Sequence, residues 1–180
     1  QRMLRLREPD KRMKDVEIAI RHLAFQTENV PYEGNLKVFL DQFCKYMNER
    51  FSPRELDREI ESFEEAITCG LLAFRAKEFG SKFDPDKQRF EGRFNRAIFD
   101  VLSGSLRNEE IQVALKSDPD KFVRLFKEVC QDSEFIRSVE VTTKSVDSTR
   151  SRFKIWYTKL NSEYGVNLSE PVIKHARDNS

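Results

Sequence analysis

The sequence predicts an all-α protein, an irregular bundle of about seven or eight helices. Three observations lead to this prediction. Apolar residues recur at intervals of three and four along nearly the whole chain of 180 residues, as they do on one face of a helix. Glycine and proline, which supply the frequent turns of β-sandwiches and barrels, number only 6 each. The one strand-like run, residues 139–143, is too short to found a sheet.

The first three helices are predicted from their apolar stripes and their start signals. The stripe of the first lies within residues 13–24, and that of the second within 36–47, after Asn35 as N-cap. The motif Ser52-Pro53-Arg54-Glu55 has the pattern of a capping box, so a long third helix begins there. Its apolar positions form a narrow seam, in which the small Gly70 would allow another helix to approach closely. The seam consists of Leu56, Ile60, Phe63, Ile67, Gly70 and Phe74.

Helical patterns continue through the second half of the chain. A fourth helix is predicted from apolar residues spaced over 90–102 and ends near Gly104. A short helix follows at about residues 109–116, and Ser133 is placed to cap one brief turn further on.

The tripeptide Pro-Asp-Lys occurs three times, at Pro9, Pro85 and Pro119, each time after an acidic residue. The unequal spacing argues against a structural repeat. An acidic residue near a helix N-cap followed by proline in the first turn is the simpler interpretation, since both are favoured there. On this basis Asp118-Pro119 begins a sixth helix.

The last long helix is predicted from about Ser145 to Tyr164, with Gly165 as its C-terminal stop. Residues 1–165 are thus expected to form a single helical domain. The tail, residues 166–180, has weak periodicity and is expected to be partly disordered or docked on a neighbour.

Charge is balanced overall but segregated locally. Lys and Arg number 32 against 31 Asp and Glu, so no global field draws the chain toward nucleic acid or lipid. Residues 1–14 and 144–160 are nevertheless basic, and they are suited to contact phosphate. The alternative is a solvated face with helix-dipole pairing. The candidates for nucleic-acid contact are Arg150, Arg152 and Lys154.

Several kinds of site are excluded by the residue inventory. Cys44, Cys69 and Cys130 are odd in number and far apart, which indicates reduced structural thiols and a cytoplasmic protein. With only His22 and His175 present, no zinc site of usual spacing and no Cys–His nucleophile is apparent. Glycine-rich phosphate loops and long apolar runs are also missing, so no cofactor and no membrane association are expected. The chain begins with glutamine and shows no signal peptide, so we expect a fragment of a longer protein.

Residues 12–25, RMKDVEIAIRHLAF, resemble a helix of the domain-of-unknown-function 262 family, the GmrSD-type restriction and phage-defence proteins. Members commonly carry an R-M-x-D-x-E-x-x-x-R-x-x-A-F helix just after a ParB-like N-terminal domain. Further segments are similar to later elements of the family, so the resemblance covers roughly residues 2–164. These segments are Tyr32 to Leu40, Phe63 to Phe74, the run RFNRAIFD from Arg93 to Asp100, and Phe135 to Arg152.

The resemblance implies a helical accessory domain without chemistry of its own. In the family, nucleotide-dependent chemistry is attributed to the ParB-like domain and its aspartate-glycine-glutamine-glutamine-arginine motif, which does not occur here. The H-N-H nuclease motif of some relatives is also absent, so no catalytic residue can be carried over. The implied partners are the ParB-like domain of the parent protein, DNA, or a second copy of the chain.

The charged residues of the first motif are the candidates for docking that domain. Glu17 and Arg21 are four apart and Arg12 and Asp15 three apart, so each pair can bridge locally on a helix. Exposed pairs of this kind contribute only a few tenths of a kcal/mol, roughly. A helical interaction or oligomerisation module unrelated to nucleic acid is the alternative function, indicated by the neutral total charge and the narrow seam of the third helix.

Overall fold

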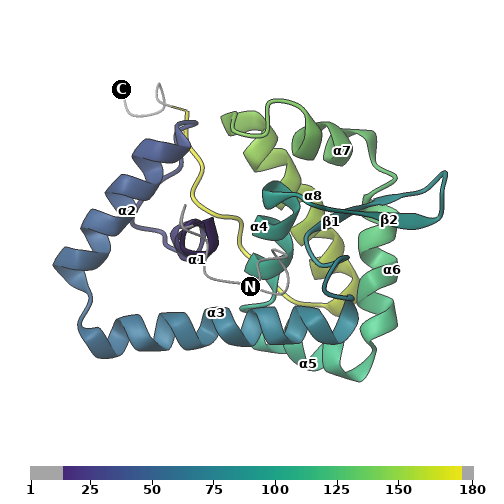
Figure 1. Cartoon of the computed structure of the whole chain (residues 1–180), viewed down its shortest axis with the longest axis horizontal. Helices are drawn as coiled ribbons and strands as arrows, with labels where there is room; N and C mark the ends of the chain where they lie inside the picture. The colour runs from purple at the N-terminus through teal and green to yellow at the C-terminus, as the bar shows by residue number, and fades with distance from the viewer. Residues whose placement is uncertain (1–13, 176–180) are drawn as a thin grey trace.

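The structure of the protein is a computed structural model, which describes residues 14–175 (Figure 1). Within this range the chain forms eight helices and one two-stranded antiparallel sheet, so it is mainly helical but not all-α. The helices are α1 (Lys14–Phe25), α2 (Leu36–Arg50), α3 (Pro53–Ala73), α4 (Arg96–Ser105), α5 (Glu109–Ser117), α6 (Pro119–Val129), α7 (Ser133–Glu140) and α8 (Val146–Tyr164). The strands are β1 (Ser81–Asp84) and β2 (Arg89–Phe94).

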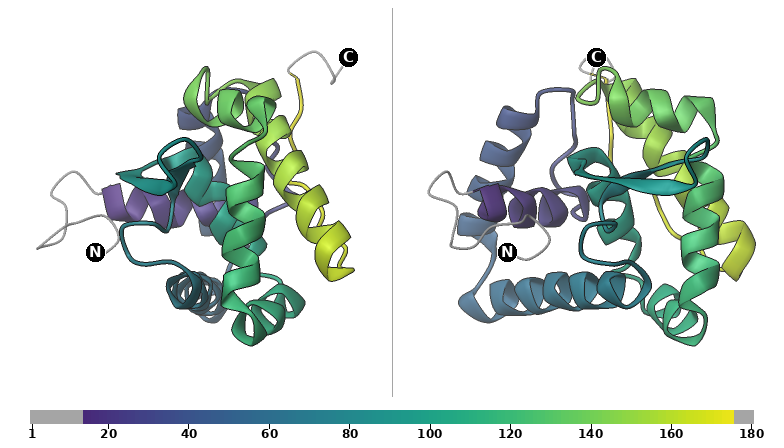
Figure 2. Two further views of the ribbon diagram at one scale, coloured as in Figure 1. Left: turned by 90° about the vertical axis from the view of Figure 1, so that its right-hand side faces the viewer. Right: turned by 45° about the vertical axis from the view of Figure 1, so that its right-hand side comes forward.

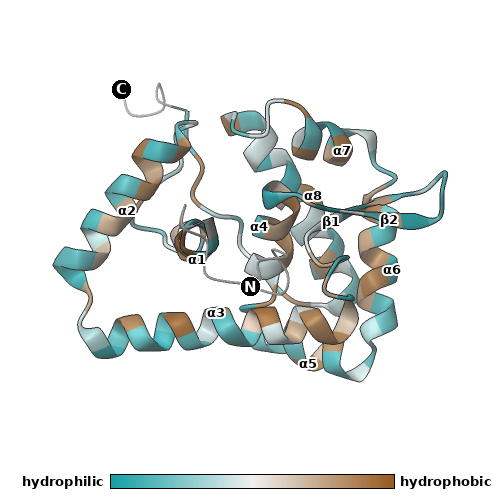
Figure 3. Cartoon of the chain, viewed as in Figure 1, coloured by the Kyte–Doolittle hydropathy of each residue, from teal (hydrophilic) through white to brown (hydrophobic). Residues whose placement is uncertain are grey.

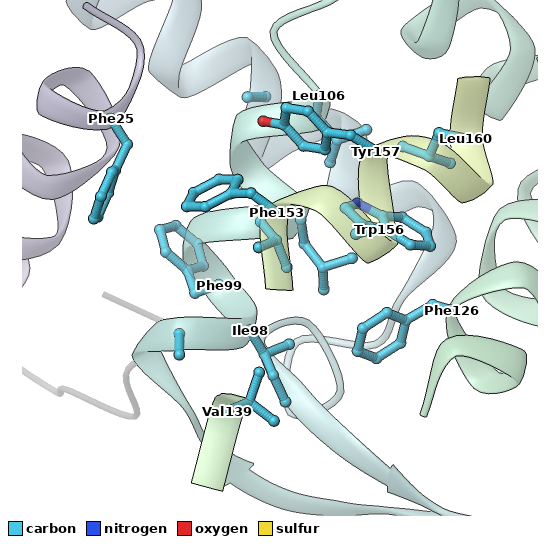
Figure 4. Close-up of a cluster of buried hydrophobic side chains, with 14 of the residues drawn as sticks. Phe25, Ile98, Phe99, Leu106, Phe126, Val139, Phe153, Trp156, Tyr157 and Leu160 are labelled. Carbon is cyan, nitrogen blue, oxygen red and sulfur yellow. The ribbon is translucent and has the colours of Figure 1, made fainter. Parts of the chain in front are cut away.

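Helix α4 lies at the centre of the molecule, with α3 running below it and α1 crossing between it and α2 (Figures 1 and 2). Every residue of α4 from Ala97 to Ser105 is buried. Helix α8 packs beside it and contributes Phe153, Trp156 and Tyr157 to the core (Figure 4). Trp156 and Tyr157 are therefore in the interior.

Most of the predicted helix ends are confirmed. The side chain of Asn35 accepts a hydrogen bond from the backbone of α2, and Ser52 and Glu55 form a reciprocal capping box on α3. Asp118 caps α6 ahead of its proline. Gly165 ends α8 at a φ of +67°, in the left-handed region that glycine adopts without a steric cost.

The hairpin β1–β2 is the main correction to the all-α expectation. Residues 90–94 belong to β2, and α4 begins only after Asn95, whose side chain caps it. The segment after Pro85 is not a helix start but the hairpin turn. There the Asp84 carboxylate accepts the backbone N–H groups of Asp86 and Lys87, the local geometry of a helix cap that is not continued.

The hairpin packs through its phenylalanines. Phe83 lies opposite Phe90 in the strand register, and their rings meet at 5.3 Å between centroids. The Phe90 ring is stacked at 6.4 Å on Phe126 of α6, which extends the core to the sheet. The far end of the hairpin is hydrophilic and points away from the body (Figure 3). Aromatic packing, more than aliphatic packing, thus ties the sheet to the helices.

Around α7, one smaller expectation is confirmed and one is corrected. The strand-like run 139–143 instead contains the last turn of α7 and the loop that follows, so its β-branched residues form no strand. The cap of α7 is Asp132, which accepts the N–H groups of Glu134 and Phe135, and Ser133 is the first helical residue.

The seam of α3 is filled along only part of its length. Gly70 faces the Phe79 ring, and a β-carbon at this position would lie 2.4 Å from Cζ of that ring. A close approach therefore occurs at Gly70, but it is made by a side chain from the loop after the helix and not, as predicted, by another helix. At the N-terminal end of the same seam, Leu56 and Ile60 remain exposed.

Residues 166–175 form no helix and lie along the body of the molecule. Ile173 is buried and forms an isolated parallel bridge with Tyr32, through hydrogen bonds that join Tyr32 to Val172 and Lys174. The side chain of Asn161 binds both backbone groups of Leu168. This part of the predicted tail is therefore docked; residues 176–180 lie outside the described range.

Of the helices between residues 14 and 175, none has both the length and the apolar character that a bilayer crossing requires.

Candidate functional site

A buried ion cluster lies on the central helix. Asp100 of α4 is only 1 % exposed and is held by two arginines from opposite ends of the chain. Nε of Arg21, on α1, donates to Oδ1 of Asp100 at 3.1 Å, and its Nη2 donates to Oδ2. On α8, Nη2 of Arg152 lies 3.6 Å from the same Oδ2. Two guanidinium groups thus share one carboxylate, and the cluster carries a net positive charge inside the protein.

The two arginines differ in how well they are compensated. Burial lowers the pKa of Arg21, but the charge and hydrogen bonds of Asp100 outweigh this and raise it above the ordinary value. The pKa of Arg152 is lowered to about 10 by burial and by the nearby Arg21, against the opposing effect of Asp100. Arg152 is the less satisfied cation, and its Nε has no hydrogen-bond partner among the described residues.

A pocket of about 440 Å³ opens above this cluster. It is bounded by α1, the segment around Tyr32, the hairpin, the start of α4 and the loop before α8. Six of its lining residues are basic and two are acidic. The basic residues are Arg21, Lys82, Arg93, Arg96, Lys144 and Arg152, and the acidic ones are Glu91 and Glu140. The pocket is therefore an electropositive hollow with a buried cation at its base.

Both acidic residues of the lining form ion pairs with the same lysine. Nζ of Lys82 lies 3.0 Å from a carboxylate oxygen of Glu91 and pairs also with Glu140, so it ties the hairpin to the end of α7. The hydrogen bond to Glu140 raises the pKa of Lys82 above its ordinary value, with that to Glu91 adding to it, and burial opposes both. By contrast, no described acidic residue lies within ion-pair distance of the exposed Arg93 and Lys144. These two cations are free to receive an anion.

The loop of residues 141–145 forms one wall of the pocket and is held from below. Its Thr143 carbonyl accepts a hydrogen bond from Nη1 of Arg152 at 2.8 Å, and its Lys144 carbonyl accepts one from the Tyr32 hydroxyl. Thr142 has a φ of +48°, a conformation that is costly for a β-branched residue. The buried arginine and tyrosine thus fix a strained loop that places Lys144 at the rim.

Asn95 completes the opposite wall. Its Oδ1 accepts the N–H groups of Ala97 and Ile98 at the start of α4, and its Nδ2 donates to the Val139 carbonyl at 2.8 Å. One side chain thereby connects β2, α4 and the end of α7. The helical spacing over residues 90–102 placed this residue inside the fourth helix, whereas the structure places it at the N-cap.

The predicted docking residues are not gathered on one surface. Arg12 lies outside the described residues. Asp15 and Glu17 are half-buried on α1, and Glu17 lies 3.5 Å from Nε of Arg96 on α4, so this acid reaches across to another helix. The side chain of Arg21 points inward and binds Asp100, which is 79 positions away in the sequence.

The predicted nucleic-acid contacts on α8 point in three directions. Arg152 is 2 % exposed and belongs to the buried cluster, which corrects its placement on a surface with Arg150 and Lys154. Nη2 of Arg150 donates to the Ile173 carbonyl at 2.9 Å and anchors the C-terminal segment. Lys154 is exposed, but it lines a groove with Glu128, Asp132 and Glu134. A basic stretch in sequence therefore forms no basic strip in space.

The thiols and the buried histidine lack the features of activated catalytic groups. Burial raises the pKa of Cys130 to about 12, and it also raises the pKa of Cys69. His22 is buried, with Nδ1 3.0 Å from the Ser103 hydroxyl, and its pKa is lowered to about 3 by burial and, to a lesser degree, by Arg107. Among residues 14–175, no group of three or more His, Cys, Asp and Glu side chains is arranged to hold a metal ion.

Sequence reasoning missed Asp100, on which the site is built. The signal was present, since Asp100 is the one charged residue in the run Ile98-Phe99-Asp100-Val101-Leu102. A carboxylate in such a run must be paired when the helix is buried. What the sequence could not supply was the identity of its partners.

No family model, no curated protein and no solved structure matches this chain.

Proposed function

We propose that this chain is a catalytically silent, helical accessory domain of a GmrSD-like, nucleotide-dependent DNA restriction or defence protein. In this role it supports the ParB-like domain of its parent protein and contacts DNA or a partner subunit. Three free thiols, none in a disulfide among the described residues, are in keeping with a reducing cytoplasmic setting.

One observation carries the proposal. Arg21, Asp100 and Arg152 come from three separate segments that resemble the family, and they meet in one buried cluster. If the resemblance reflects a shared fold, the segments that resemble the family should meet in the core, as these three do. The charges at that centre cost free energy to bury, so a role beyond packing is favoured for them.

The test compares this chain, alone and joined to its ParB-like domain, for nucleotide hydrolysis and DNA cleavage. We expect both activities only in the joined protein. Activity of the chain alone would contradict the proposal, as would a joined protein that is inactive on all nucleotides and DNA substrates tried.

The DNA contact is tested separately by its salt dependence. Binding through phosphates weakens steeply as salt increases, because counterions are released from the DNA. Titration of duplex DNA at low and high salt should show this slope. Binding that is undetectable or independent of salt would exclude phosphate contacts by this chain.

A helical interaction or oligomerisation module is the second candidate function. It is favoured by the exposed N-terminal end of the α3 seam, where the apolar side chains of Leu56 and Ile60 are left partly open to solvent. Light scattering on the chain and on a Leu56→Glu, Ile60→Glu variant tests it. An oligomer that dissociates in the variant would support this alternative, and a strict monomer in both would contradict it.

A further inference from the structure

We infer that the basic pocket is a binding site for a phosphate monoester, whose dianionic phosphate group lies over Arg152 and is closed in by Arg93 and Lys144. The inference does not depend on the proposed function. It stands on the lining of the pocket, the unmatched charge beneath it and the unpartnered nitrogen of a buried arginine.

The charge balance selects an anion with more than one negative charge. The six basic residues of the lining face Glu91 and Glu140, with Asp100 below them, so the balance of the whole site is positive. Lys82 already satisfies both lining acids, and Asp100 is held in two hydrogen bonds by Arg21. The cations left for a ligand are Arg152, Arg93, Lys144 and the loosely paired Arg96.

The donors on these cations suit the oxygens of a phosphate group. Guanidinium groups present planar forks of N–H donors that match phosphate geometry, while lysine adds a compact charge. Arg152 donates to the Thr143 carbonyl through Nη1 and lies near Asp100 through Nη2, which leaves its buried Nε without a partner. A buried N–H of a charged group without a partner is costly, and an anion bound in the pocket would offset the incompletely compensated charge of this guanidinium.

The site is fixed before any ligand arrives. The Thr143 and Lys144 carbonyls are bound by Arg152 and Tyr32, so the strained loop is held in place from the core. Asn95 fixes the opposite wall by bonding to α4 and to the Val139 carbonyl. Little of the binding free energy would therefore be spent on ordering the protein. The volume of about 440 Å³ is at the small end for ligand pockets, with room for a phosphate and a sugar-sized group.

The test is isothermal titration of the chain with ribose 5-phosphate, inorganic phosphate and ribose, at constant ionic strength. We expect ribose 5-phosphate and phosphate to bind and to raise the melting temperature, and ribose to do neither. The Arg93→Ala and Lys144→Ala variants change exposed side chains and should fold normally, and each should weaken binding about tenfold. Lys154→Ala, an exposed lysine on the far side of α8, is the matched control and should bind as the unchanged chain does.

A second measurement examines the buried arginine without replacing it. On titration with ribose 5-phosphate, the Nε–H resonance of Arg152 should shift in a ¹⁵N spectrum, while that of the exposed Arg124 should not. Equal affinity in the Arg93→Ala and Lys154→Ala variants, or an unmoved Arg152 resonance at saturation, would overturn the assignment. No binding of either phosphate compound would do so as well.

The source of the phosphate is distinguished by a short single-stranded DNA with and without a 5′-phosphate. Tighter binding of the 5′-phosphorylated strand than of ribose 5-phosphate identifies a nucleic-acid end as the source. The reverse order identifies a small phosphorylated metabolite. Both results support a monoester site. Binding of the unphosphorylated strand as tightly as ribose 5-phosphate would show that internal phosphodiesters are recognised, and would overturn it.

Discussion

At the base of the pocket, Asp100 binds two guanidinium groups and can neutralise only one of them. Removing a single partner from a buried ionic cluster is more damaging than replacing the whole cluster, because it leaves charge unpaired in the interior. For Asp100→Asn we expect the free energy of unfolding to decrease by about 3–5 kcal/mol, measured by urea denaturation. The matched control is Glu17→Gln, whose partly exposed pair with Arg96 should contribute less than about 1 kcal/mol. Similar losses in the two variants would contradict this description of the cluster.

His22 makes the stability of the protein depend on pH in the acid range. Burial lowers its pKa to about 3 in the folded protein, so between that value and its ordinary pKa the unfolded chain binds the extra proton. Stability from this group is therefore full above about pH 6.5 and is lost as the pH decreases toward 3. The loss by pH 4.5 amounts to about 3 kcal/mol relative to neutral pH.

The measurement compares urea denaturation at pH 7 and pH 4.5 for the unchanged chain and for His22→Gln. The variant should lose less stability between the two pH values than the unchanged chain, even if it is less stable overall. The same slope in both proteins would exclude His22 as its source.

At the level of single elements, the N-cap of a helix can be predicted from sequence when no adjacent residue is equally suited to the position. Asp132 and Ser133 are adjacent and both suit an N-cap, and only the structure shows that Asp132 has this role. Asp132→Ala should lower the free energy of unfolding by about 1 kcal/mol, through the loss of two hydrogen bonds at the start of α7. Ser133→Ala should change it by less than half of that. Thermal denaturation of both variants decides between the two assignments.

The hairpin shows why the remaining elements could not be predicted. Phe90, Phe94 and Ala97 follow helical spacing, so local periodicity favours a helix through this region. In the folded protein the Phe90 ring stacks on Phe126, while Phe94 meets Phe99 at 5.5 Å between centroids. These contacts come from parts of the chain that a local pattern does not include. Starts, stops and the buried faces of most helices are local properties, and they were predictable.

The candidate site was less predictable than the fold for a related reason. Its lining combines residues from α1, the hairpin, α4 and the loop before α8, none of which is unusual alone. The basic run 144–160 led to a surface interpretation, yet Arg152 points inward while Arg150 and Lys154 do not join it. On a helix, neighbouring residues project to different sides, so charge density in sequence does not define a charged face.

At the scale of the whole molecule, the C-terminal segment stabilises the N-terminal half. Ile173 is buried beside Tyr32, and Arg150 holds its carbonyl. We expect Ile173→Ala to lower the free energy of unfolding by about 2 kcal/mol and to speed hydrogen exchange at the Tyr32 amide, which donates to the Val172 carbonyl. Lys174→Ala leaves the backbone hydrogen bonds in place and is the control. Unchanged exchange at Tyr32 in the Ile173 variant would contradict a stabilising role for the segment.

The same bridge has a consequence for how the protein is made. It joins Tyr32 to a residue near the C-terminus, and the Arg21–Asp100 pair spans 79 positions. Contacts between such distant residues raise the contact order, which slows folding. During synthesis the first helices emerge long before the residues that complete them. We therefore expect α1 to have α2 and α3 as its first native partners on the ribosome, and Phe25 to lack its contact with Phe153 and remain available to chaperones until nearly the whole chain has been released.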